Sequence, residues 1–403
     1  MDLNLKKDFP LLSQPPYMPF CYADSAATTQ KPSVVLDALT RHYSKNNANV
    51  HRGAYRLSEY ATESFEEARK KIGKFFNVSD QGVVFCRSAT EGLNLLAHGL
   101  SLMHPGAHVL LSRLEHHANI IPWQEAAKKN GLKLHWVNPD ENGVIKLEDV
   151  KQLFELYPIS IVSFVHTSNT LGTIQPLKDL FKFCKTKNAV TIADCCQSFL
   201  HSDLSLDDMN ADAIVCSSHK MYGPTGLGLI VSSQQFLDKL PVYQTGGGMI
   251  LSVSTEQADF MNAPYKFEAG TPFIEGATAL AAAFEYVSTI DPVKINQHFE
   301  ALVNHGLKVF SNLGSFELMM PKNHDRAPIF SLVHPKIHAH DLSTFLDQSA
   351  GICARAGHHC TMPLLSFLKK PATYRLSYHL YNNLDDIDYC AKALLNAEKF
   401  FNV

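Results

Sequence analysis

Apolar and polar residues alternate along the middle of the chain in a way that predicts strands separated by helices. From about residue 82, short runs rich in β-branched residues are predicted as strands over 83–85, 108–112, 159–166, 189–194, 213–217 and 228–233. Helices are predicted between most of these runs, including 91–102, 119–130, 147–156 and 178–187. Apolar strands that alternate with helices indicate an α/β fold in which a parallel sheet is covered on both faces.

An amphipathic helix is predicted ahead of this region, over residues 60–76. Its apolar face consists of Ala61, Phe65, Ala68, Ile72 and Phe76, which recur at helical spacing. Glutamates and lysines four residues apart on the opposite face supply weak supporting ion pairs.

The pattern changes after about residue 240, which indicates a second and smaller α+β domain. A glycine-rich stretch at 245–248 is followed by a segment without clear periodicity and then by an alanine-rich helix at 276–287. Strands are predicted near 328–333 and 373–378, and a terminal helix near 384–401. A run of strands and helices in this order is typical of an α+β unit.

Composition narrows the class of protein. With 45% hydrophobic and 19% charged residues over 403 positions, the chain can bury a large core and is not disordered. A net charge of −3 without any basic block argues against nucleic acid as the main partner. No apolar run reaches the roughly 18 residues of a membrane helix, and the start of the chain lacks the features of a signal peptide.

Cysteine usage indicates the compartment. The nine cysteines are an odd number and form no CxxC motif, so a disulfide framework or a zinc ribbon is not expected. Several of them, such as Cys86 and Cys216, lie in apolar runs typical of small core residues. We therefore expect a cytoplasmic protein in a reducing environment.

Polar residues cluster directly after the predicted strands, which is where ligands bind in parallel sheets. The residues in these positions are Ser88, Ala89 and Thr90, His116 and His117, Ser168 and Asn169, Asp194 and Gln197, and Ser217 to Lys220. Because the carboxyl ends of parallel strands meet at one edge, we expect these groups to converge on one site.

The first of these groups, Ser88 to Glu91, opens a helix and matches a capping box. It is interpreted either as a simple helix cap or as an anion site, since free N–H groups at a helix start suit a phosphate. Neither GxGxxG nor GxxxxGK[ST] occurs, so no dinucleotide fingerprint or Walker loop is predicted.

Asp194 and Lys220 occur in the order that a pyridoxal-phosphate enzyme with a parallel sheet needs. Asp194 closes an apolar strand, where it is either a cap or ion-pair residue or the partner of a pyridinium nitrogen. Lys220 follows the next strand, where it is either a surface lysine or an amine that can lose its proton and attack an aldehyde.

Three further residues have both a structural and a chemical interpretation. His117, at a strand end, is either structural or a ring that stacks on the cofactor, whereas a metal site lacks a third suitably spaced ligand. Cys360 lies in a polar loop beside histidines and Arg355, which favour a thiolate, or is an incidental exposed thiol. Arg375 binds a substrate carboxylate or forms a surface ion pair.

Taken together, these residues resemble the Suf-type (group II) cysteine desulfurases, fold-type I pyridoxal-phosphate enzymes of the class V aminotransferase family. The resemblance runs from about residue 22 to the terminal helix. The matching stretches are NVHRG (49–53), ATEGLN (89–94), EHHANIIPWQ (115–124), SNTLGT (168–173), ADCCQS (193–198), SSHKMYGPTG (217–226), FEAGTP (267–272) and RAGHHCTMP (355–363).

The resemblance implies a large domain at 21–275, built on a mostly parallel seven-stranded sheet. It implies a small domain at 276–403, joined by residues 1–20, that carries the cysteine loop. A homodimer is also implied, because Thr271 would reach the phosphate of the neighbouring subunit.

The resemblance also implies roles for individual residues, with pyridoxal 5'-phosphate as cofactor. Lys220 would hold the cofactor covalently, His117 would stack on its ring, Asp194 would bind the ring nitrogen and Gln197 the phenolic oxygen. The phosphate would be bound by Thr90, Ser217, His219 and Thr271, with Ala89 adjoining. The substrate carboxylate would be bound by Arg375 and Asn169, with Ala27, His51 and Arg355 nearby. Cys360 would be the nucleophile.

The implied reaction converts L-cysteine to L-alanine and leaves a persulfide on Cys360. The sulfur would then pass to an acceptor, either SufE-like or SufU-like, for iron–sulfur cluster assembly, and Cys360 is expected on a mobile surface loop. Selenocysteine lyase or another class V lyase is the alternative reaction, and a non-catalytic protein on the same fold is the alternative class. Ala89 and Thr361 depart from the family pattern, which more often has a hydroxyl residue and an alanine at these positions.

Overall fold

A seven-stranded sheet forms the centre of the computed structural model, which describes all residues except 1–2, 203, 321 and 323–324. Residues 1–2 of the predicted N-terminal segment therefore lie outside the described residues. The strands follow the order β2 (Val83–Cys86), β8 (Gly228–Ser232), β7 (Ala213–Ser217), β6 (Val190–Asp194), β5 (Ile159–Val165), β3 (His108–Ser112) and β4 (Lys133–Val137). Only β8 runs against its neighbours, so the predicted mostly parallel sheet is confirmed.

Alternation along the strands divides the sheet into two buried faces. Val84, Val109 and Ile161 face α4 (Ala89–Met103), α5 (Ile121–Asn130) and α9 (Gln234–Lys239). Phe85 and Val162 point to the other face, which is covered by α3 (Arg56–Phe75), α6 (Leu147–Leu156), α7 (Leu177–Thr186) and α10 (Ile274–Ser288). Side chains point to opposite faces with period two, so each apolar run supplies both layers of the core.

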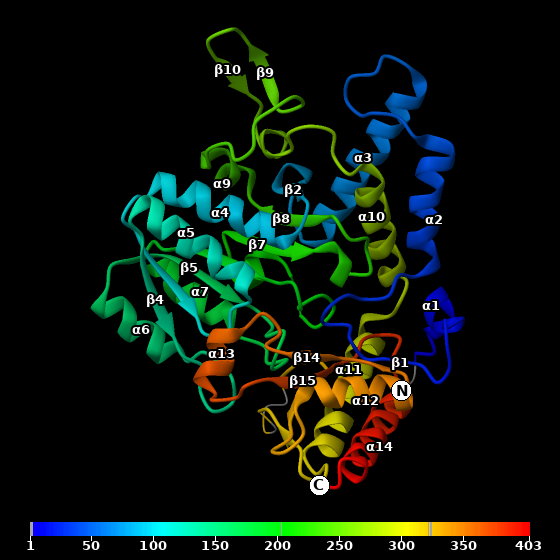
Figure 1. Cartoon of the computed structure of the whole chain (residues 1–403). Helices are drawn as coiled ribbons and strands as arrows, with labels where there is room; N and C mark the ends of the chain where they lie inside the picture. The colour runs from blue at the N-terminus through cyan, green and yellow to red at the C-terminus, as the bar shows by residue number, and fades with distance from the viewer. Residues whose placement is uncertain (1–2, 203, 321, 323–324) are drawn as a thin grey trace.

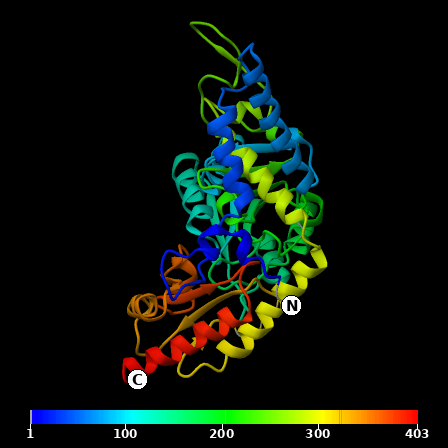
Figure 2. The same ribbon diagram turned by 90° about the vertical axis from the view of Figure 1, so that its right-hand side faces the viewer.

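A smaller antiparallel sheet lies below the large one in Figure 1. Its strands follow the order β11 (Glu317–Leu318), β12 (Ile329–Val333), β15 (Thr373–Ser377) and β14 (Arg355–Gly357). The surrounding helices are α11 (Pro292–Phe310), α12 (Ala339–Ala350), α13 (Met362–Phe367) and α14 (Leu384–Phe400). Figure 2 shows α11 and α14 side by side, as their contacts also indicate.

The N-terminal segment joins the two parts of the molecule. It carries α1 (Pro10–Ser13), and its strand β1 (Cys21–Tyr22) pairs in parallel with β13 (Ile352–Cys353). Buried Phe9 packs against Tyr222, which lies between β7 and β8 of the large sheet, and against Tyr381 of the smaller part. The predicted boundary at 275/276 falls at the start of α10, which packs on α2 (Ser33–Arg41) and α3, and the division remains a prediction.

The segment without periodicity after residue 245 contains a two-stranded hairpin, β9 (Ile250–Val253) and β10 (Ala258–Phe260). Figure 1 shows this hairpin projecting at the end of the molecule opposite the small sheet. The remaining short helix is α8 (Leu206–Met209). Among the described residues, no helix is long and apolar enough to cross a membrane.

A buried ion pair anchors the stretch of chain that leads to Thr271. The Arg69 guanidinium on α3 is fully buried and donates to the two carboxylate oxygens of Glu268 at 2.7 and 2.8 Å. It also donates to Val83 O at 2.8 Å, and Glu268 accepts from Phe85 N at 2.8 Å. These bonds compensate the desolvation of both charges, and they fix residue 268 beside the large sheet.

Candidate active site

A cavity of about 220 Å³ lies where the carboxyl ends of the large sheet's parallel strands meet residues of the small sheet. Most of the residues that the sequence predicts for one site line this cavity. The predicted residues that line it are Ala27, Ala89, Thr90, Asn169, Asp194, Gln197, Ser217, His219, Lys220, Arg355, Cys360 and Arg375.

The parallel strands bring these groups together. Asp194 is the last residue of β6 and Ser217 is the last residue of β7, its direct neighbour in the sheet. Lys220 ends the short 3-10 helix that follows β7, and Asn169 follows β5. The carboxyl ends of neighbouring parallel strands lie at the same edge of the sheet. The Lys220 amine, the Asp194 carboxylate and the Asn169 amide therefore line the same cavity.

The start of α4 forms one wall. The Ser88 hydroxyl accepts from Glu91 N at 3.3 Å, so the predicted helix cap is confirmed. The Ser217 hydroxyl accepts from Ala89 N at 2.9 Å, which leaves the hydroxyl hydrogen of Ser217 free to donate elsewhere. Gly228 allows this close approach, because a Cβ there would lie 2.3 Å from the Ser88 carbonyl carbon.

Asp194 is almost completely buried at the cavity. One of its oxygens, Oδ1, accepts from Cys196 N at 3.1 Å. Gln197 lies beside it and donates from Nε2 to Ala26 O at 2.6 Å. Cys196 lines the cavity as well, and burial followed by the Asp194 charge raises the pKa of its thiol well above the usual value. Cys196 was not predicted as a site residue, although its position between Asp194 and Gln197 could have indicated it.

His116, and not the predicted His117, faces the cavity. Burial and then the nearby Lys220 charge lower the pKa of His116 to about 4, so its ring is neutral near pH 7. His117 does not line the cavity, and its Nε2 accepts from Met362 N at 3.1 Å. Adjacent residues cannot both face the same side of this turn, and the sequence alone did not decide between them.

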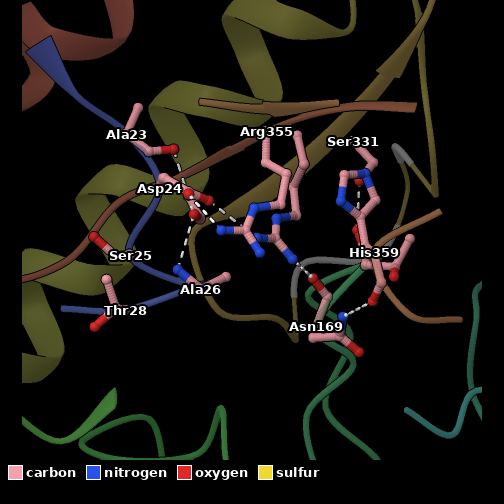
Figure 3. Close-up of polar contacts among 12 residues, drawn as sticks. Ala23, Asp24, Ser25, Ala26, Thr28, Asn169, Ser331, Arg355 and His359 are labelled. Carbon is pink, nitrogen blue, oxygen red and sulfur yellow. Dashed lines mark hydrogen bonds and ion pairs between the residues drawn. The ribbon is translucent and has the colours of Figure 1, made fainter. Parts of the chain in front are cut away.

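Arg375 lies at the end of the cavity nearest the small sheet. It is 2% exposed, donates to Asn169 O at 2.8 Å and pairs with Asp24 at 3.1 Å. Asp24 also pairs with Arg355 at 3.3 Å, and Figure 3 shows the carboxylate of Asp24 and the side chain of Arg355 side by side. Asp24 was not predicted as a site residue, although it pairs with both arginines that line the cavity.

Three buried polar atoms on residues at this end lack a partner among the described residues. They are Asn169 Oδ1, Arg375 Nε and His359 Nδ1. An unpaired buried polar group costs on the order of 1–3 kcal/mol, so a bound ligand that pairs with these atoms would relieve that cost. Arg375 Nε could donate to a carboxylate and Asn169 Oδ1 could accept from an amine, so the two atoms suit a small ligand that carries both groups.

Cys360 occupies an exposed turn at the edge of the cavity. Its carbonyl oxygen accepts from His117 N at 2.7 Å, which gives His117 a part in the site through its backbone. The neighbouring His359 is buried, and its carbonyl oxygen accepts from Asn169 Nδ2 at 2.7 Å (Figure 3). The cysteine of the small sheet's loop is thus held against the edge of the large sheet.

Thr271 and His51 lie away from this cavity. Thr271 is exposed and lines a separate hollow of about 820 Å³. His51 places its Nε2 3.6 Å from Glu66 and packs edge-on against Phe65 and Tyr265. Within one chain, therefore, neither residue lines the cavity that the other predicted residues share. No group of three potential metal ligands occurs among the described residues.

Buried neutral histidines predict how stability depends on pH. Burial lowers the pKa of His116 and His166 to about 4, and that of His201 and His359 to about 3, from 6.5. As the pH falls below 6.5 the unfolded chain binds protons that the folded chain does not, so the free energy of unfolding decreases. Burial lowers the pKa of His219 to about 4 as well, so five histidines share this trend. Burial raises the pKa of Glu115 to about 8, which opposes the trend with a single group.

We expect the urea midpoint to fall between about pH 7 and about pH 5, with each such histidine costing about 1.4 kcal/mol per pH unit once well below its unfolded pKa. Urea unfolding followed by circular dichroism measures this change. A midpoint that is unchanged or rises on acidification would contradict the assignment of neutral histidines.

Comparison with known proteins identifies the family of this chain. Residues 21–390 match the family model described as Aminotransferase class-V. The chain belongs to the class V aminotransferase family. This is a family of pyridoxal-phosphate enzymes.

Several proteins similar to this chain in sequence and structure are cysteine desulfurases. The chain is 37% identical over 402 residues to a probable cysteine desulfurase of Halalkalibacterium halodurans, covering 99% of this chain and 98% of that protein. It is 37% identical over 390 residues to a cysteine desulfurase of Escherichia coli, covering 96% and 95%. The apo structure of the cysteine desulfurase from Thermococcus onnurineus matches with a TM-score of 0.92 at 33% identity, covering 98% of both chains.

Proposed function

We propose that this chain is a pyridoxal-phosphate-dependent cysteine desulfurase that converts L-cysteine to L-alanine and collects the sulfur as a persulfide on Cys360. One observation carries the proposal: a single cavity is lined by the Lys220 amine, the buried Asp194 carboxylate and the Cys360 thiol. The full-length similarity to cysteine desulfurases supports the same reaction.

The residues around the cavity fit the cofactor. When bound, pyridoxal phosphate supplies an electron-withdrawing ring that acidifies the Cα–H of an amino acid. Lys220 would hold its aldehyde carbon, and Asp194 would accept from the protonated ring nitrogen. The neutral ring of His116 would cover one face, in place of the predicted His117, and Gln197 has a second amide hydrogen to donate to the phenolic oxygen.

The wall at α4 would hold the phosphate. Thr90 and the start of α4 offer donors, and the Ser217 hydroxyl keeps a free hydrogen because its oxygen accepts from Ala89 N. His219 is half-buried, and burial followed by the Lys220 charge lowers its pKa to about 4, so near pH 7 it would donate as a neutral ring. Ala89 contributes no side-chain donor, and its N–H is already occupied.

The other end of the cavity would bind the substrate carboxylate. Arg375 is buried, is already oriented by Asp24, and keeps its Nε without a partner. Asn169 lies directly beside it and is tied through its amide nitrogen to His359 O. Ala27 and the more exposed Arg355 border the same end. A fixed guanidinium is suited to orienting a carboxylate, so the substrate sulfur would point toward the exposed turn.

The protein residues then move one proton and one sulfur atom. The free amine of Lys220 is the base positioned to take the Cα proton. The Cys360 thiolate attacks the substrate sulfur, so a new S–S bond forms while the carbon–sulfur bond breaks. The electron pair of the broken bond stays with carbon, which takes up a proton to become the methyl group of alanine. One cysteine and one thiol thus give one alanine and one persulfide.

The protein would act as a homodimer and pass its sulfur onward. Thr271 and His51 do not reach the cavity of their own chain, and in a dimer they would complete the site of the neighbouring subunit. Cys360 is exposed, so its persulfide would be open to the thiol of an acceptor protein. Iron–sulfur cluster assembly is the process that such an acceptor would supply.

The test is to incubate the purified, cofactor-loaded protein with L-cysteine. We expect one alanine for each sulfur transferred, and a mass increase of one sulfur atom on the peptide that contains Cys360. L-Selenocysteine is the comparison substrate. Alanine release from selenocysteine only, or sulfur found on any other cysteine, would contradict the proposal.

A further inference from the structure

The turn that presents Cys360 has an unfavourable backbone conformation. His358 O accepts from Thr361 N at 2.9 Å, and the two residues between them, His359 and Cys360, have φ values of +51° and +57°. A turn with two left-handed central residues favours glycine or asparagine, because a Cβ crowds the backbone in this region. Neither residue here is glycine or asparagine, so the surrounding structure must hold the turn in place.

Contacts from the large sheet hold the two backbone carbonyls of this turn. Cys360 O accepts from His117 N, and His359 O accepts from Asn169 Nδ2, both at 2.7 Å. The His359 ring is fixed as well, with its Nε2 2.7 Å from Thr373 Oγ1. The two residues with positive φ are therefore each attached to neighbouring elements.

A pair of hydroxyl groups closes the end of the turn. Thr361 is fully buried, and its hydroxyl donates to His358 O at 2.9 Å. The hydroxyl oxygen of Thr361 also lies 2.7 Å from Thr170 Oγ1. Because the hydroxyl hydrogen of Thr361 is already donated to His358 O, Thr170 is the donor in this second bond. Thr170 is itself buried, and its carbonyl oxygen accepts from Ser331 Oγ at 2.6 Å. These hydrogen bonds thus connect Ser331 on β12, Thr170 in the segment that follows β5, and the start of the turn at His358.

We propose that the Thr170–Thr361 hydroxyl pair is a positioning element that holds the Cys360 turn in its left-handed conformation and so aims the thiol at the substrate sulfur. Thr361 stands where the resemblance leads one to expect alanine, which has no hydroxyl. The aim of the thiol rests on the proposed function, whereas the rigidity of the turn does not. Both threonines are positioning residues, because neither lines the cavity.

Thr361→Val and Thr170→Val test this inference, because valine keeps the shape of threonine and removes only the hydroxyl. In the resting protein without cysteine, we expect amide hydrogen exchange of residues 357–362 to be about tenfold faster in Thr170→Val, the scale of one lost hydrogen bond, and at least tenfold faster in Thr361→Val, which loses two. With cysteine, we expect kcat to fall roughly tenfold while KM stays within about twofold, because binding is intact and alignment is not.

Thr361→Ser is the matched control, since it restores the hydroxyl and should return both exchange and kcat to the wild-type range. Unchanged exchange in both valine variants, or faster exchange with unchanged kcat, would overturn the inference. If Thr361→Val fails to fold, judged by urea unfolding, Thr170→Val tests the same bond from the other side. Faster exchange in a protein that never releases alanine would support the anchoring and refute the proposed function instead.

Discussion

Replacing Lys220 by alanine is expected to abolish the release of alanine from cysteine, with a loss of roughly 10³-fold or more. Lys220 lines the cavity from the 3-10 helix that follows β7, and Asp194 lines it from the end of the neighbouring strand β6. Its removal takes away both the amine that would hold the cofactor and the base that would take the Cα proton. The measurements are alanine release and, in the wild type, the site of cofactor attachment after borohydride reduction.

Two further variants make the Lys220 result specific. Lys220→Arg keeps the positive charge but not a usable amine, so it should be as inactive as Lys220→Ala. Lys128→Ala removes an exposed lysine of α5 that pairs with Glu125 and does not line the cavity, so it should leave activity unchanged. Attachment of the cofactor to another lysine, or turnover in Lys220→Ala comparable to wild type, would refute the assignment.

Replacing Cys360 by alanine is expected to stop turnover of cysteine while the cofactor stays bound. The thiol lies on an exposed turn outside the group of residues proposed to hold the cofactor. Removing the attacking atom leaves the carbon–sulfur bond uncleaved, so we expect a loss of about 10²-fold or more, on the scale of other single catalytic groups. Visible absorbance of the loaded protein and alanine release measure the two effects separately.

Cys353→Ala is the matched control for this variant. Cys353 is half-buried seven positions earlier on β13 and contacts Tyr17, so its removal tests for a general effect of losing a thiol. We expect its activity to match the wild type. Full turnover of cysteine in Cys360→Ala would favour a lyase that needs no thiol, one of the alternative reactions.

Most of the large sheet was predictable because its strands are buried on both faces and read as apolar runs. The predicted strands 108–112 and 213–217 coincide with β3 and β7, and the predicted helix 147–156 coincides with α6. Strand β4 was missed because it lies at the edge of the sheet and mixes Lys133 and His135 with apolar residues. Apolar and polar residues alternate from Leu132 to Trp136, but the stretch is short and lacks the continuous apolar run by which the central strands were predicted.

The candidate site was predictable at the level of strand ends but not of side-chain direction. Asp194, Lys220, Arg375 and Cys360 share one cavity, which is where the order of strands placed the first two. His116 and His117 are adjacent in sequence, and only the local turn decides which one faces the cavity. Asp24 precedes any strong pattern, and its role depends on two arginines more than 300 residues away, at 355 and 375.

The anchored turn at Cys360 has a consequence for how sulfur leaves the molecule. The sequence suggested a mobile loop, but in this structure the carbonyl oxygens of His359 and Cys360 are bonded to the large-domain edge. With its backbone held in this way, Cys360 is not expected to move outward with the bound sulfur. We therefore expect the acceptor protein to insert its own thiol toward an immobile persulfide, so that its shape determines whether the sulfur is transferred.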